Sequence, residues 1–213
     1  VPLFAGKYAV MATINNATYA GSTSGTLTIL PKDAYVTPAD ASRVYGETDP
    51  EFTGILDGFL DTDLVFATYE REPGDQVGAY PIRADVWSMS TDYDPLLNYA
   101  ITINPATFTI APRPIEVTAD AQTKFADEAD PPLTYRITDG ALAFNDAFSG
   151  ALARAPGEGP GGYPIGQGTL ALDSNYTLAF VGADLTTVEA TNTAPVANAV
   201  GPYLGAINSA ITF

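Results

Sequence analysis

An internal repeat constrains this chain more than any other feature of its sequence. The stretch from Val36 to Thr53 aligns without a gap with the stretch from Val117 to Thr134, at an offset of 81 positions. Six aligned positions are identical, and four more keep their chemistry. Self-similarity at a fixed period of this size marks a repeat architecture in which each copy is one structural module. The chain is therefore expected to fold as a series of similar units.

The alignment continues in two further blocks downstream. GAYPI at Gly78 matches GGYPI at Gly161, and Asn98-Tyr99 matches Asn175-Tyr176. The offset changes to 83 and then to 77 between these blocks, which places small insertions in loops, where they are tolerated. We assign two complete modules, at residues 33–111 and 112–190.

Both ends of the sequence are interpreted as parts of other modules. GTLTILPK at residues 25–32 aligns with ATFTIAPR at residues 106–113, again at an offset of 81. Residues 1–32 are therefore interpreted as the C-terminal part of a truncated module. Residues 191–213 are interpreted as a linker and the first strands of a further domain.

The segments within each module are short, alternate between apolar and polar residues, and are separated by turn residues. The 19 Gly and 17 Pro are spread along the whole chain, as an all-β protein with many turns requires. We expect an all-β fold of tandem small β-sandwich, immunoglobulin-like modules with about seven strands each. A β-grasp-like module with one helical turn is the alternative, and Asp63 and Asp146 are the candidate N-caps of that turn. Pro81 and Pro164 are expected at a strand start or on a sheet edge.

Charge and composition exclude several classes of function. Nine Lys and Arg stand against 25 Asp and Glu, a formal net charge of −16 that repels phosphate backbones and anionic membranes. No nucleic-acid partner is expected. The chain has neither Cys nor His, which removes most nucleophile and general-base chemistry, so it is not expected to be an enzyme. No apolar run approaches the roughly 20 residues of a membrane helix, and no membrane insertion is expected.

Acidic residues recur at the same position of both modules. Glu47 and Asp49 in the first copy correspond to Glu128 and Asp130 in the second, where Asp127 adds a further carboxylate. In one interpretation the Asp-Pro pairs start turns and the carboxylates cap backbone N–H groups. In the other, these five residues provide oxygen ligands for calcium near a module junction.

Aromatic residues also recur in both modules. The pair Tyr45-Gly46 is interpreted as a turn with Gly at positive φ, and Tyr99 and Tyr176 as packing residues. Trp87 is the only Trp and has no counterpart in the second module. It is the residue at which we would expect a ligand, if any aromatic side chain binds one.

Three blocks carry a resemblance to a known family. VYGETDP from Val44, GAYPI from Gly78 and NYAITINPATFTI from Asn98 resemble the MBG repeats of the YGX type. The second module resembles a divergent copy, because Ala126-Asp127 replaces the Tyr-Gly pair. NTAPVANAVGPY from Asn192 is similar to the first strand of a PKD-like, immunoglobulin-type domain.

The resemblance implies a non-catalytic stalk or spacer in a large, adhesin-like protein of the bacterial cell surface or extracellular space. Its partners would be neighbouring modules of the same or an identical chain, and surface glycans are a further possibility. Two alternatives stay open. One is a filament-forming subunit, in which the end strands of one chain complete a module of its neighbour by strand addition. The other is a calcium-dependent adhesive module that binds a glycan or another surface.

Overall fold

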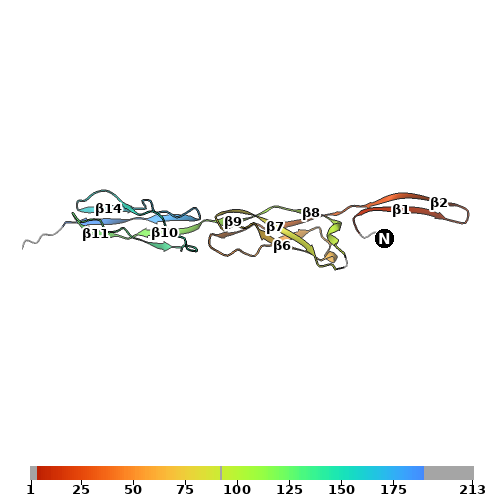
Figure 1. Ribbon diagram of the computed structural model, residues 1–213, viewed down its shortest axis with the longest axis horizontal. Helices are drawn as coiled ribbons and strands as arrows, with labels where there is room; N and C mark the ends of the chain where they lie inside the picture. The colour runs from red at the N-terminus through yellow and green to blue at the C-terminus, as the bar shows by residue number, and fades with distance from the viewer. Residues whose placement is uncertain (1–3, 92, 190–213) are drawn as a thin grey trace, which may run out of the picture.

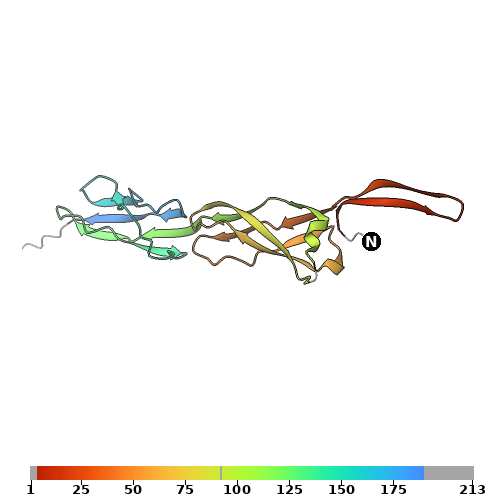
Figure 2. The ribbon, with the colours of Figure 1, turned by 45° about the vertical axis from the view of Figure 1, so that its right-hand side comes forward.

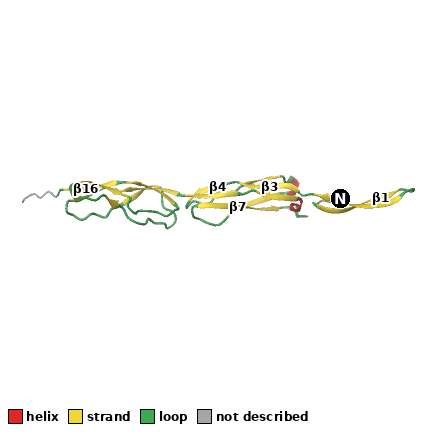
Figure 3. Ribbon diagram, turned by 90° about the horizontal axis from the view of Figure 1, so that it is seen from above, coloured by secondary structure: helices red, strands yellow, loops and turns green. Residues whose placement is uncertain are grey.

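The computed structural model describes residues 4–91 and 93–189, which form an elongated row of β structures (Figure 1). A two-stranded hairpin lies at one end, and two sandwich-like modules follow it along the long axis. The order is the same when the molecule is turned (Figure 2) and when it is seen from above, where most strands run close to the long axis (Figure 3). The all-β prediction is confirmed.

The hairpin consists of β1 (Gly6–Asn15) and β2 (Ala20–Ile29), which pair antiparallel along their whole length. Two residues, Leu30-Pro31, connect β2 to the first module. This linker is short enough to keep the hairpin close to the module that follows it.

The first module consists of seven strands in two sheets. One sheet has the order β5-β3-β8 and the other the order β4-β9-β7-β6, and the pairs β3·β8 and β4·β9 are parallel. Its strands and its two short 3-10 turns are β3 (Lys32–Pro38), β4 (Ala41–Val44), β5 (Gly54–Asp57), η1 (Asp61–Asp63), β6 (Val65–Arg71), β7 (Gly78–Ser88), η2 (Pro95–Asn98), β8 (Tyr99–Ile103) and β9 (Ala106–Ala111).

The second module repeats this arrangement, with sheets of the order β12-β10-β15 and β11-β16-β14-β13. The parallel pairs recur as β10·β15 and β11·β16. Its strands are β10 (Arg113–Ala119), β11 (Gln122–Phe125), β12 (Tyr135–Asp139), β13 (Ala153–Arg154), β14 (Gly161–Gly166), β15 (Tyr176–Val181) and β16 (Ala183–Val188).

Alternation along the strands builds the core. Every second residue of β3 and β9 is buried, so that Val36, Phe108 and Ile110 lie between the sheets while their neighbours face solvent. In the second module Val117 and Leu185 are fully buried in the same way. The buried clusters of the two modules touch at their junction and form one continuous apolar core there.

The expected helical turn and its caps are corrected by the structure. Asp63 is the last residue of the 3-10 turn η1, whose N-cap is Leu60 with no side-chain cap hydrogen bond. Asp146 lies in a hydrogen-bonded turn that is not helical. Neither Asp is an N-cap, because each carboxylate accepts hydrogen bonds from tyrosine hydroxyl groups instead.

The two prolines lie inside strands rather than at their starts, on stretches that are paired on one side only, which agrees with the expected edge position. Pro81 is in β7 and Pro164 in β14, each one residue before the first residue of its strand that pairs with the outer strand, β6 or β13. The carbonyl groups of both prolines accept from residues just beyond that partner strand, Glu72 and Ala155. The N and the C=O of one strand residue face the same side of the strand. The missing N–H of each proline therefore faces the end of the outer strand, and the ladder with β9 or β16 loses no hydrogen bond.

Candidate functional site: the junction between the modules

A single residue, Pro112, separates the last strand of the first module from the first strand of the second. The next residue, Arg113, contacts both sides of the junction. Its guanidinium group donates to the carbonyl oxygen of Tyr45 in the first module and to that of Ala141 in the second, each at 2.8 Å. The linker is therefore fixed by hydrogen bonds as well as by the proline ring.

Tyr45 is the main contact that crosses the junction. Its side chain comes from the loop after β4, is 4% exposed, and donates from Oη to the Asp146 carboxylate at 3.1 Å. Its ring makes edge-to-face contacts with Phe144 and Tyr176, both at 5.5 Å between centroids. Burying a ring of this size stabilises the contact by about 2 kcal/mol.

The second module supplies the binding site for this ring, which we call the tyrosine socket and define by Ala143, Asp146 and Tyr176. Tyr176 Oη donates to the same Asp146 oxygen at 2.6 Å and accepts from the Ala143 backbone N–H at 2.9 Å. Burial raises the pKa of Tyr176 to about 12. Burial, followed by the hydrogen bond to Asp146, also raises the pKa of Tyr45. Both hydroxyl groups therefore stay protonated donors at neutral pH.

Gly46 allows the close approach of the two modules. Its φ is +83°, a region that favours glycine, and a Cβ built there would lie 2.4 Å from Cβ of Ala143. The interpretation of Tyr45-Gly46 as a turn with Gly at positive φ agrees with this backbone. No sequence pattern indicated that the same two residues dock one module onto the next.

A second hydrogen bond recurs at both junctions of the chain. Asn175, 2% exposed, accepts from the backbone N–H of Val77 through Oδ1 at 2.9 Å. At the junction between the hairpin and the first module, Asn98 Oδ1 accepts from the backbone N–H of Ala5 at 2.8 Å. Val77 and Ala5 each precede the glycine that starts a Gly-x-Tyr strand. The Asn of each Asn-Tyr pair thus holds the preceding unit.

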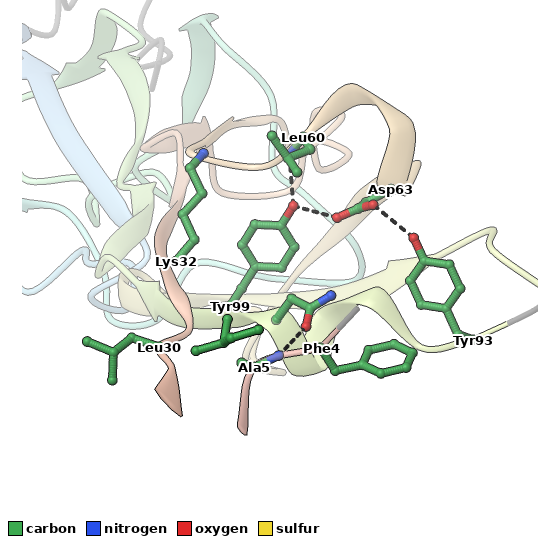
Figure 4. A pocket seen from close by; sticks show the side chains of 10 residues that line it. Phe4, Ala5, Leu30, Lys32, Leu60, Asp63, Tyr93 and Tyr99 are labelled. Atoms are coloured by element: carbon green, nitrogen blue, oxygen red, sulfur yellow. Dashed lines mark hydrogen bonds between the residues drawn. The ribbon is translucent and has the colours of Figure 1, made fainter. Parts of the chain in front are cut away.

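The first module has its own tyrosine socket, made of Leu60, Asp63 and Tyr99. Tyr99 donates to Asp63 at 2.6 Å and accepts from the Leu60 N–H at 2.9 Å, as in the second module (Figure 4). Tyr93 donates to the other Asp63 oxygen at 3.2 Å. Beside these groups lies a cavity of about 320 Å³, bordered on the hairpin side by Phe4, Ala5, Ile29 and Leu30.

Comparison with known families identifies the repeated units. Residues 34–109 and 115–186 match the MBG domain of the YGX type, and residues 1–33 match an MBG domain. The chain belongs to the MBG family. No curated protein sequence and no solved structure matches it. The resemblance seen in the sequence is thereby confirmed for the MBG repeats, whereas the PKD-like segment from Asn192 lies outside the described residues.

Each MBG module also contains an ion-pair cluster near its C-terminal end. In the first, the two Asp49 oxygens each accept from one arginine, Arg43 and Arg71, both at 2.6 Å. The arginine side chains are 5% and 12% exposed. Arg71 also stacks over Tyr80 and Phe108, at 5.4 and 5.0 Å from the ring centroids. Asp49 therefore compensates two largely buried cations.

The second module has the same cluster with two conservative changes, Lys124 in place of Arg43 and Glu158 in place of Asp75. Asp130 accepts from Lys124 at 2.9 Å and from Arg154 at 2.6 Å, and Glu158 pairs with both cations. Hydrogen bonds from Arg154 and then Lys124 lower the pKa of Asp130 to about 2. Arg154 stacks over Tyr163 at 5.3 Å, as Arg71 does over Tyr80.

The recurring acidic residues are thus placed in structural roles. The carboxylates of Glu47 and Glu128 each accept a hydrogen bond from the backbone N–H of the residue three positions earlier. Asp127 lies in the loop with a φ of 70°. Within residues 4–91 and 93–189, no group of three or more Asp or Glu converges as a metal site would require. Calcium binding by Glu47, Asp49, Asp127, Glu128 and Asp130 stays a prediction. The carboxylates of Asp49 and Asp130 are already bound to cationic side chains.

The sequence interpretation missed the second cation of each cluster, although a signal for it exists. REPGD from Arg71 matches RAPGE from Arg154 at an offset of 83, the same offset as the GAYPI and GGYPI blocks. Extending that block upstream would have paired the two arginines and the acids Asp75 and Glu158.

Trp87 lies on β7, where its ring stacks on Phe66 of the neighbouring strand with centroids 5.0 Å apart. Both side chains are 40% exposed. The pair forms a half-exposed aromatic surface, and a ligand at Trp87 stays a prediction.

Proposed function

We propose that this chain is a non-catalytic, rigid spacer of a large bacterial surface protein, which holds other domains away from the cell. MBG repeats are modules of surface proteins. Among the described residues, none of the helical segments is long and apolar enough to cross a membrane. The observation that carries the proposal is the buried junction, where Tyr45, Arg113 and Asn175 each bind across the module boundary.

The junction explains how small modules can form a stiff rod. A one-residue linker alone still allows bending, but a buried ring and several hydrogen bonds between modules require those contacts to break when the axis bends. Each module contacts only its neighbours, so the stiffness of the whole array depends on how rigid each junction is.

Small-angle scattering combined with spin labels tests the proposal. We expect a radius of gyration well above the roughly 17 Å of a compact chain of this length. The chain has no Cys, so Glu70→Cys and Asp139→Cys place one label on each module. Electron-spin distance measurement should then give one narrow distribution, and Tyr45→Ala should broaden it because the socket loses its ring.

Tyr19→Ala is the matched control, since Tyr19 is 69% exposed and lies in the hairpin. That variant should keep the narrow distribution. A compact radius of gyration, or equal widths for the native chain and Tyr45→Ala, would contradict a rigid spacer.

A second candidate function, adhesion to a glycan, is favoured by one observation, the exposed stack of Phe66 and Trp87. Flat aromatic surfaces of this kind suit the apolar face of a sugar ring. Trp87 is the only Trp, so a glycan that binds there should change the tryptophan fluorescence of the native chain, with or without calcium.

Phe66→Ala should abolish that change while keeping the fluorophore, whereas Tyr35→Ala, an exposed residue elsewhere in the module, should not. A glycan panel that leaves the fluorescence unchanged would remove this candidate. The filament alternative depends in part on residues 196–213, which lie outside the described residues.

A further inference from the structure

The hairpin β1·β2 repeats the strand pair β7·β9 of the first module without the other strands of that module. Gly6 faces Ile29 in the pair β1·β2, as Gly78 faces Ile110 in the pair β7·β9, so the two pairs have the same register. In that register Val10 corresponds to Ile82, and Leu27 to Phe108. Ile82 and Phe108 are 5% and 0% exposed, whereas Val10 and Leu27 are 44% and 43% exposed.

The first module indicates which element pairs with the edge of such a strand pair. There β4 runs parallel to β9 from the pair Ala41–Phe108 to the pair Val44–Ala111, and the Tyr45-Gly46 loop follows directly. Within residues 4–91 and 93–189, β2 pairs only with β1. The edge of β2 that corresponds to the β4-binding edge of β9 is therefore open.

The cavity beside the first tyrosine socket lies at the end of that open edge. In the second module the equivalent socket is filled by the ring of Tyr45. In the first module the Asp63 carboxylate already accepts from Tyr93 and Tyr99 (Figure 4), yet a carboxylate has about four lone-pair sites and can accept further donors. The cavity of about 320 Å³ is large enough for a phenol ring.

We propose that the open edge of β2 and this cavity together bind a β4-type strand that ends in Tyr-Gly and comes from an MBG module. The strand pairs in parallel with β2 and extends its sheet, and its Tyr enters the cavity and donates to Asp63. Main-chain strand addition supplies the affinity, and the socket supplies the specificity.

The loop of the second module does not have the properties of this donor. It keeps the backbone of the Tyr-Gly loop, since Ala126 N–H binds the Val188 carbonyl at 2.8 Å as Tyr45 N–H binds that of Ala111 at 2.9 Å. However, it has no ring at Ala126 and carries a Cβ at Asp127, where the docked junction leaves no room for one. The donor is therefore a Tyr-Gly strand, and not any MBG strand.

A chimera tests the proposal at high effective concentration. Residues 1–5 are replaced by a copy of residues 33–77, which is joined directly to Gly6. The copy is then connected to β1 as the original segment is connected to β7. We expect the backbone amides of β2 to exchange with solvent at least about tenfold more slowly than in the native chain, because the added strand protects them.

The matched control carries the second module's pair in the copy, Tyr45→Ala with Gly46→Asp. We expect the Leu60 amide of the original first module, which reports on the socket, to exchange more slowly in the chimera than in the native chain. The control should lose that effect and part of the protection of β2. Unchanged exchange of β9 and β16 shows that the native modules remain folded. If β2 exchanges at the native rate in the chimera, or if the control protects Leu60 equally, the proposal is overturned. Neither result affects the rigidity of the junction at Tyr45, which is measured separately.

Discussion

Gly46→Ala is expected to uncouple the two modules. The new Cβ would lie 2.4 Å from Cβ of Ala143, and the residue would keep a φ of +83° that L-residues rarely adopt. The left-handed backbone and the steric overlap together are expected to weaken the contact between the modules by about 3 kcal/mol. Calorimetry should show the two modules unfolding in separate transitions, the second below the transition of the native chain.

Gly78→Ala is the matched control for this substitution. Gly78 lies in the same module, its φ is not in the left-handed region, and a Cβ there would come no closer than 3.8 Å to Tyr80. That variant should unfold as the native chain does. Native-like unfolding of Gly46→Ala would mean that the junction does not couple the modules.

Asp49→Ala is expected to destabilise the first module by about 3 kcal/mol, because it leaves two largely buried cations with the exposed Asp75 as their remaining counter-ion. The two cations it would leave are Arg43 and Arg71, whose side chains are 5% and 12% exposed. Chemical denaturation measures the change in the free energy of unfolding. Glu51→Ala removes an exposed acid two residues away and should have little effect.

The pH dependence of stability provides an independent measure of the same cluster. Although burial acts to raise it, hydrogen bonds from Arg71 and Arg43 lower the pKa of Asp49 below its usual value. A depressed pKa in the folded state stabilises the protein above the unfolded pKa and loses that effect as the pH falls through the folded value. The native chain should therefore lose stability below about pH 4, and Asp49→Ala should lose less. An equal loss in both would contradict the assigned role of Asp49.

Much of the fold could be predicted from the sequence because its signals are local. Alternation, turn residues and the repeat itself are visible within short windows, and they led to the strands of both modules. The paired blocks also identified Asp49 and Asp130 as recurring positions. Their partners Arg71 and Arg154 lie 22 and 24 residues away, in other strands, so that only the upstream extension of a repeat block indicates them.

The junction could not be predicted in the same way. Tyr45 binds Asp146, which lies 101 residues further along the chain, and no local pattern links the two. Within one module, Tyr45 and Gly46 are consistent with an ordinary turn, and Asp146 with a cap. Their function becomes visible only when the end of one module meets the start of the next, since the socket and the ring are carried by different copies.

The parallel strand pairs determine how the chain responds when its two ends are pulled apart. Each module begins in a strand that pairs in parallel with its neighbour, β3 with β8 and β10 with β15, and ends in one that pairs in parallel with β4 or β11. Tension along the axis makes these strands slide lengthwise past each other, so that all the hydrogen bonds of a pair resist together. The hairpin differs, because Gly6 and Ile29 lie opposite each other at its open end, and force applied there separates its pairs one after another. We therefore expect the hairpin to extend under load before either of the two modules does.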